Sequence, residues 1–348
     1  MRVFAAFAAP TAARADAPEL WFLRVHRASR LPPPLFGGLV AMLAGAAVCS
    51  ALLVPEVAAD ELLRRDVLAS AAFFATSLGF LLGAAPVIFP ASVRDLEQLR
   101  GLLPLPPERF EQVRQALLRM PTGIFLRQAL LGAAVGSAHA ALLFEGTPYP
   151  AASLAPAAGT VALWVMMFQI ATPMLANAQL FGELGRQARP DLLLAHRLQP
   201  FGATALRPTL FVIGLQCAYP LLTLGSEDGL AVENYLGLGV SLALVAGLFL
   251  LPLRGVRRQV AAHKEETLSA LDARIAALGG EGRLLEADTT DETLARAEHL
   301  LTLRGRIAAV PTWPLGLAGA RRFALYVILP PLTWAAAALV ERWIDQSL

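Results

Sequence analysis

Polar side chains recur on one face of an apolar segment near the middle of the chain. Gln169, Thr172 and Gln179 follow one another at helical spacing, and Asn177 lies beside them. Pro173 removes a backbone hydrogen bond from the middle of the same segment. In a bilayer, a kinked helix with a row of amides could line a path or a site for a polar solute. The same amides could instead join helices by hydrogen bonds, worth about 0.6 kcal/mol each, and both interpretations stay open here.

Five further polar positions are candidates for the same path. Arg127 and His139 lie in the preceding apolar segment, where Arg127 can reach the headgroups and His139 is deep enough to relay a proton. A buried structural histidine is the alternative for His139. Glu233 stands at the outer edge of a later segment, where carboxylates from several subunits would select cations. Tyr326 and Thr333 are polar positions of the last apolar segment.

Residue patterns that serve catalysis or metal binding are not found in the sequence. It contains no Gly-x-Ser-x-Gly, no His-Glu-x-x-His and no Walker-type phosphate loop. Its five histidines are scattered, and Cys49 and Cys217 both lie in apolar segments. Lys264 is the only lysine and the net charge is +2, so there is no polybasic tract for nucleic acid. We therefore expect no enzyme activity, cofactor, resident metal or nucleic-acid partner.

The composition is that of a membrane protein. Of 348 residues, 56% are hydrophobic and 16% charged, whereas about a quarter of the residues of soluble domains are charged. The apolar residues gather into segments of roughly 17 to 25 residues, enough to cross a bilayer core of about 30 Å. We predict an all-α, polytopic membrane helix bundle with about seven transmembrane helices, at residues 35–57, 67–89, 123–144, 155–180, 208–224, 230–253 and 323–340.

Basic residues predict the orientation of these spans. They collect in alternate connections, at residues 1–34, 91–121, 186–207 and 254–322, and the connections between these hold almost none. Cytoplasmic flanks retain arginine and lysine. We therefore expect a protein of the bacterial inner membrane with the N-terminus inside and the C-terminus outside.

The chain divides into four regions. Residues 1–34 form a cytoplasmic segment with an interfacial amphipathic helix, and 35–253 a six-helix transmembrane bundle. Residues 254–321 form a cytoplasmic helical hairpin, and 322–348 the seventh span with a short external tail. Within the bundle, the connection 91–122 reads as two short amphipathic helices. They would rest on lipid headgroups, or dock on a cytoplasmic partner or on the hairpin.

The hairpin has its own boundary signals. Gly279 and Gly280 would end its first helix, and Thr289-x-x-Glu292 has the form of a capping box that begins the second. Two helices of this size bury too little surface to be stable alone. We therefore expect residues 254–306 to pack on the chain itself, on a second copy in a homo-oligomer, or on a cytoplasmic protein partner.

Small residues at four-residue spacing predict close helix packing in three places. They are Gly79-x-x-x-Gly83, Gly132-x-x-x-Gly136 and Gly239-x-x-x-Ala243-x-x-x-Gly247. Such residues let two helix backbones approach one another. We expect a tight bundle.

The C-terminal residues resemble the tail of a family of bacterial multi-pass membrane proteins. The resemblance rests on the pairs and short runs Trp313-Pro314, Arg322-Phe323-x-Leu325-Tyr326, Pro330-x-x-x-Trp334 and Leu339-Val340-Glu341-Arg342. In the family pattern Phe-Asp follows Trp-Pro, and here Leu315 and Gly316 stand in those places. The resemblance implies that the hairpin and the last span form one unit, and it implies no activity.

Three functions are compatible with these features. The first is a channel or transporter-like protein for a small solute or ion, lined by the polar positions named above. The second is the permease subunit of an ABC-2 type exporter. The chain is similar in layout to such permeases at two places. They are the interfacial helix before the first span and the Leu-Pro-rich connection after the second span, where an ATPase would dock. The third is a membrane-anchored sensor or scaffold that acts through its hairpin.

Overall fold

The regular structure of the chain is helical. The computed structural model describes residues 11–145, 150–225, 234–278 and 290–313, with Arg321, Ala324, Leu325, Ile328 and Leu332. Within these residues the only β pairing is an isolated bridge between Glu19 and Arg119. The predicted all-α class is confirmed for these ranges of the chain.

Five helical stretches in the described ranges are long and apolar enough to cross a membrane. They are Pro33–Leu53, Glu61–Gln98, Ala151–Gln187, Ala195–Leu222 and Gly239–Ala277. The expected span at 123–144 is a helix of 22 residues, α8 (Thr122–Leu143), but Arg127, Gln128 and His139 make it less apolar than the five. Most of the expected span at 323–340 lies outside the described residues.

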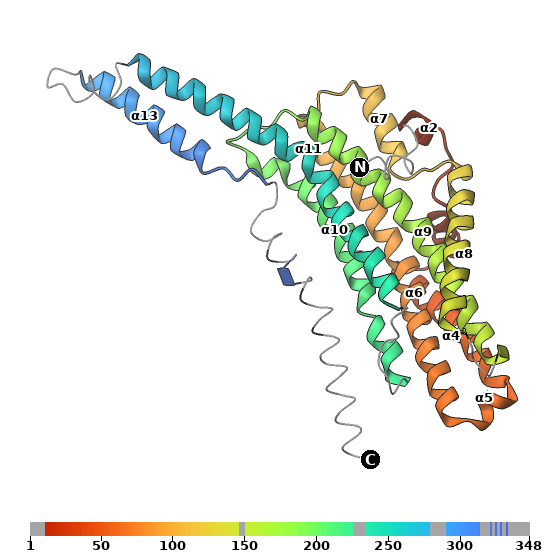
Figure 1. Cartoon of the computed structure of the whole chain (residues 1–348). Coiled ribbons are helices and arrows are strands. Elements are labelled where there is room, and N and C mark those ends of the chain that lie inside the picture. The colour runs from red at the N-terminus through yellow and green to blue at the C-terminus, as the bar shows by residue number, and fades with distance from the viewer. Residues whose placement is uncertain are drawn as a thin grey trace.

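The bundle consists of three helical pairs. In the first, α4 (Pro33–Cys49) continues through η1 (Ser50–Leu53), and α5 (Pro55–Ala59) leads into α6 (Glu61–Gln98). In the second, α8 precedes α9 (Pro150–Gln187). In the third, α10 (Gln199–Gln216) lies between η3 (Ala195–Leu198) and η4 (Tyr219–Gly225) and precedes α11 (Asn234–Ala277). In Figure 1, α5 marks one end of the bundle and α7 (Pro107–Ala116) the other. We call these the α5 end and the α7 end.

The second helix of each pair is much longer than a bilayer core. Helices α6 and α9 have 38 residues each, or about 57 Å at 1.5 Å per residue, and α11 has 44 residues. α6 passes Pro86 and Pro90 without ending. The expectation of two short helices in 91–122 is therefore wrong: the first is the end of α6, followed by η2 (Arg100–Leu102). Each proline removes only one backbone donor, and buried Leu96 and Leu99 hold the last turns against the core.

Small residues bring the helices together at two of the three predicted places. A Cβ on Gly83 would lie 2.9 Å from the Cα of Gly37 on α4. A Cβ on Gly136 would lie 2.8 Å from the Cα of Val161 on α9. At the third place the packing is looser: a Cβ on Gly247 would meet the Leu175 side chain of α9 at 3.4 Å, an ordinary van der Waals distance, and Gly239 has no atom within 4 Å of such a Cβ. A contact without a predicted motif joins α9 to α11, where Gly185 would meet the backbone nitrogen of Val256 at 2.6 Å.

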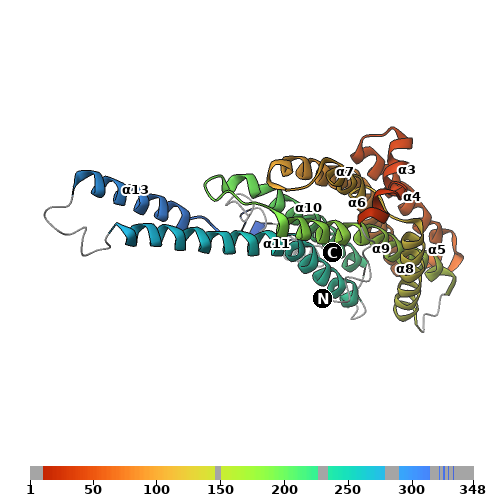
Figure 2. The same ribbon diagram turned by 90° about the horizontal axis from the view of Figure 1, so that it is seen from above.

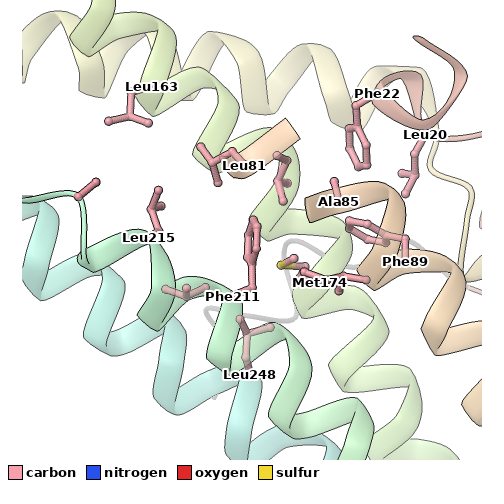
Figure 3. Packing of buried hydrophobic residues seen from close by; sticks show 14 of the residues in the cluster. Leu20, Phe22, Leu81, Ala85, Phe89, Leu163, Met174, Phe211, Leu215 and Leu248 are labelled. Atoms are coloured by element: carbon pink, nitrogen blue, oxygen red, sulfur yellow. The ribbon is translucent and has the colours of Figure 1, made fainter. Parts of the chain in front are cut away.

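Two of the three hydrophobic clusters of the described chain are large. In the first, Leu81, Ala85 and Phe89 of α6 face Met174, Phe211 and Leu248, and the N-terminal segment adds Leu20 and Phe22 (Figure 3). The rings of Phe22 and Phe89 lie 5.3 Å apart. The second core, at the α7 end, joins α6, α7, α9, α10 and α11 through residues such as Leu99, Phe110 and Val256.

The apolar face of α7 is buried inside the second core. Phe110, Val113 and Leu117 are each less than 5% exposed. Burial of three such side chains contributes about 5 kcal/mol or more. The structure covers this face of α7 with the bundle, in a cluster that also includes Val260 and Leu271 of the hairpin.

A helical hairpin extends from the α7 end. The second half of α11 leaves the bundle, and α13 (Asp291–Ala308) runs back beside it, as both views show (Figures 1 and 2). The first helix of the hairpin is thus a direct continuation of a membrane-length helix, so the boundary expected at residue 254 falls inside α11. The second helix begins one residue later than predicted, because Thr290, and not Thr289, accepts the hydrogen bond from the Thr293 backbone nitrogen.

Candidate functional site

The amide of Gln169 on α9 is fully engaged by two distant segments. Its Oε1 accepts a hydrogen bond of 3.0 Å from the indole Nε1 of Trp21 in α3 (Trp21–Ser29). Its Nε2 donates to the carbonyl oxygen of Phe125 on α8 at 2.8 Å. One side chain therefore joins three helices, and both polar atoms of its amide have a partner within the protein.

The amide of Asn177, two turns further along α9, is engaged in the same way. Its Oδ1 accepts a hydrogen bond of 2.6 Å from Nη2 of Arg14 in α2 (Thr11–Ala15), and its Nδ2 donates to the Leu117 carbonyl at 3.0 Å. We call Arg14, Trp21, Gln169 and Asn177 the amide clasp. It fastens the N-terminal segment to the polar face of α9.

Arg14 is an unusual member of the clasp because it is a buried cation. It is 2% exposed, and burial lowers its pKa to about 10. Its Nε also donates to the Arg119 carbonyl at 3.4 Å. No carboxylate of the described chain pairs with it. Burial of a cation without a carboxylate partner costs free energy. The hydrogen bonds from the guanidinium to neutral oxygens nevertheless fix the position of the N-terminal segment.

The backbone fastens the same segment a second time. Leu20 donates its backbone N–H to the Leu118 carbonyl at 3.0 Å, and Met120 donates to the Pro18 carbonyl at 3.2 Å. Arg119 adds a bond of 2.7 Å from Nη1 to the Ala15 carbonyl. The N-terminal segment is thus held between α9 and the connection from α7 to α8.

The other two members of the predicted stripe lie apart from the clasp. Gln179 is half-buried on α9. Thr172 is buried and reaches the wall of a 240 Å³ cavity between α9 and α11. The rest of that wall is apolar, with residues such as Trp164, Phe168 and Leu244. This cavity suits hydrocarbon better than a polar solute.

The remaining predicted positions do not join the stripe. His139 is buried on α8 and its Nδ1 accepts a hydrogen bond of 2.9 Å from the Trp164 indole, as in a structural histidine. Arg127 is exposed near the start of α8, where its side chain can reach the headgroups. Glu233, Tyr326 and Thr333 lie outside the described residues.

Several buried polar groups were not predicted from the sequence. Asp95 on α6 is 2% exposed and forms an ion pair with Arg207 on α10. Gln216 is buried and, like the buried amide of Gln128, has no hydrogen-bond partner within the described chain. Polar residue type was the available signal for all of them. Their partners lie more than 100 residues away or are not found, so spacing could not reveal them.

A basic groove is the largest of the described cavities that involve α11. Its volume is 800 Å³, and Arg254, Arg257, Arg258 and Trp313 are among its lining residues. In the sequence these arginines indicated only the orientation of the spans. The groove differs from the cavity at Thr172 in having charged walls.

Comparisons with protein-family models, with curated proteins and with solved structures found no match. The class of the protein therefore follows from the fold alone. It is an all-helical protein with several helices that are long and apolar enough to cross a membrane.

Proposed function

We propose that the chain is a membrane-anchored sensor or scaffold of the bacterial inner membrane that acts through its helical hairpin. In this proposal the α7 end is cytoplasmic, because the arginine-rich connections gather there. The N-terminus is then inside, and α8 and residues 323–340 complete seven spans, the last of which ends outside.

The observation that carries this proposal is the continuity of α11. At about 66 Å it is twice as long as a bilayer core, and its second half is the first helix of the hairpin. The hairpin is closed by bonds from Lys264 Nζ to the Ala308 and Val310 carbonyls at 2.7 and 2.9 Å. Displacement of the span would therefore move the hairpin directly.

One edge of α13, beside its contact with α11, is suited to another helix. Leu294 and Leu301 of α13 are 43% and 51% exposed, and they are one heptad apart on the same face. Between them Ala297 is buried against α11. We propose that a second copy of the chain covers this face, since identical leucine rows are self-complementary.

A channel or transporter is the second candidate, and one observation favours it. The amides of Gln128 and Gln216 are buried without partners in the described chain, as groups that meet water or a solute would be. Such a path would not use Gln169 or Asn177 unless the clasp opened. The ABC-2 permease is supported less, because the apolar face of α7 that an ATPase would need is already covered.

Cysteine crosslinking on the full chain in membranes tests the proposal. A parent with Cys49 and Cys217 replaced by alanine would carry Leu294→Cys or Leu301→Cys. Both variants should form disulfide-linked dimers on mild oxidation.

The matched control is Arg296→Cys, which is also exposed but about 200° around α13 from Leu294. Absence of dimers at residues 294 and 301, or equal dimers at residue 296, would remove the hairpin as a self-association surface.

A further inference from the structure

The basic groove on α11 combines an apolar half with a cationic half. Ala246, Gly247 and Leu250 line the half beside the membrane-length section of the helix. Arg254, Arg257 and Arg258 line the other half, which begins a single helical turn further along, and none of the described lining residues is acidic. The change from apolar to basic takes place within about 6 Å along the helix axis.

Packing on the opposite side of α11 fixes the direction of these arginines. Leu253 and Val256 are fully buried, and Gly255 packs on the backbone of α9 at Gly182. Positions 254, 257 and 258 therefore have to lie on the open face, where all three side chains are exposed.

The segment after α13 completes the groove. Trp313 lies against Arg257, with the guanidinium carbon 4.6 Å from the centre of the indole ring. The bonds from Lys264 to the Ala308 and Val310 carbonyls hold the start of this segment. Arg257 is thus partly ordered before any ligand binds, which lowers the entropy that binding has to overcome.

We propose that this groove binds an anionic phospholipid, with the phosphodiester and headgroup on Arg254, Arg257 and Arg258 and one acyl chain along Ala246, Gly247 and Leu250. Arginine clusters match the oxygen geometry of phosphate groups. Basic pockets beside membrane helices bind anionic lipid headgroups in the same way. The continuous apolar half selects a lipid over a free phosphate. The proposal does not depend on the hairpin being a self-association surface.

Lipid titration of the full chain in detergent micelles tests the proposal. The probes are dioleoyl-phosphatidylglycerol and dioleoyl-phosphatidylcholine, with inorganic phosphate in a separate arm, and native mass spectrometry counts the bound lipids. We expect phosphatidylglycerol to bind at least tenfold more tightly than phosphatidylcholine, and phosphate not to compete at millimolar concentration. Each basic residue contributes about fivefold, so R254Q/R257Q/R258Q should lower the affinity for phosphatidylglycerol roughly a hundredfold.

Two further variants separate the groove from general charge attraction. A246F fills the apolar half without a change in charge, and Ala246 is exposed, so the fold should tolerate it. It should weaken phosphatidylglycerol binding at least tenfold. R94Q/R109Q/R189Q removes three exposed arginines elsewhere and should change the affinity less than twofold.

The proposal fails if phosphatidylcholine binds as tightly as phosphatidylglycerol, or if the two triple variants lose the same affinity. Normal binding by A246F would likewise remove the acyl-chain half of the site. If R254Q/R257Q/R258Q does not fold, the affinity of A246F for phosphatidylglycerol decides whether the proposal holds.

Discussion

Replacement of Gly255 by alanine should separate α9 from α11 at their closest contact. A Cβ at this position would fall well inside 3.0 Å of the Gly182 carbonyl oxygen and at 3.0 Å from the Arg186 backbone nitrogen. Both are backbone atoms, so no side chain can move aside and one helix has to shift. Overpacking of this kind costs about 3 kcal/mol, whereas alanine in a helix gains about 1 kcal/mol over glycine. We expect Gly255→Ala to lower the free energy of unfolding by about 2 kcal/mol.

Gly305→Ala is the matched control, because Gly305 also lies inside a helix and has no atom within 4 Å of an added Cβ. It should gain up to about 1 kcal/mol, which leaves a difference of about 3 kcal/mol between the two variants. Unfolding in mixed micelles with increasing dodecyl sulfate, followed by tryptophan fluorescence, measures both. If Gly255→Ala were as stable as Gly305→Ala, the close contact between α9 and α11 would not exist and the reasoning would be refuted.

Three further predictions concern the clasp, α7 and the orientation. In the clasp, Arg14→Leu and Asn177→Leu should each destabilise the chain by about 1 to 3 kcal/mol, because each leaves a buried polar partner unpaired. The double variant should be more stable than either single variant, since it removes both polar partners and leaves neither unpaired; additive losses in a double-mutant cycle would contradict this. In α7, hydrogen bonds from Arg114 and Gln115 and the charge of Arg114 lower the pKa of Glu111 to about 2. A depressed carboxylate pKa stabilises the fold above the unfolded pKa of about 4.5 and loses that effect as the pH falls toward 2. Thermal midpoints should therefore fall less for Glu111→Gln than for the wild type between pH 5 and pH 2, although the exposed position keeps the difference small. For the orientation, alkaline phosphatase should be active when fused after Leu348 and inactive when fused after Arg258, and the reverse result would invert the proposed topology.

The sequence predicts the helices of this protein better than it predicts their partners. Apolar segment length gave the membrane-length helices, and glycine spacing gave the contacts at Gly83 and Gly136. The closest contact was missed because Gly255 is a single glycine among arginines and leucines, with no repeat to mark it. The end of the second long helix was misplaced because Pro90 reads as a break, whereas burial of Leu96 and Leu99 carries α6 onward.

The candidate site shows the same division. Helical spacing put Gln169 on a polar face with Asn177 beside it, and the structure has both buried on α9. What covers that face was not predictable, because Trp21 and Arg14 come from a segment 148 and 163 residues away. Residue type indicates a buried polar group, but only the packed chain decides whether a solute or another side chain satisfies it.

The distance along the chain between the two halves of the clasp sets an order for biogenesis. Arg14 leaves the ribosome 163 residues before Asn177, a delay of roughly 8 to 30 s at ordinary rates of synthesis. During that time the amides of α9 that bind Arg14 and Trp21 have not been made, and the N-terminal segment has only earlier partners such as Phe89 and the backbone of residues 118–120. The clasp closes only after the fourth long apolar segment has been inserted. Closure of the clasp therefore reports that most of the bundle has been assembled, and a chain truncated after α8 would hold the N-terminal segment without its two bonds to α9.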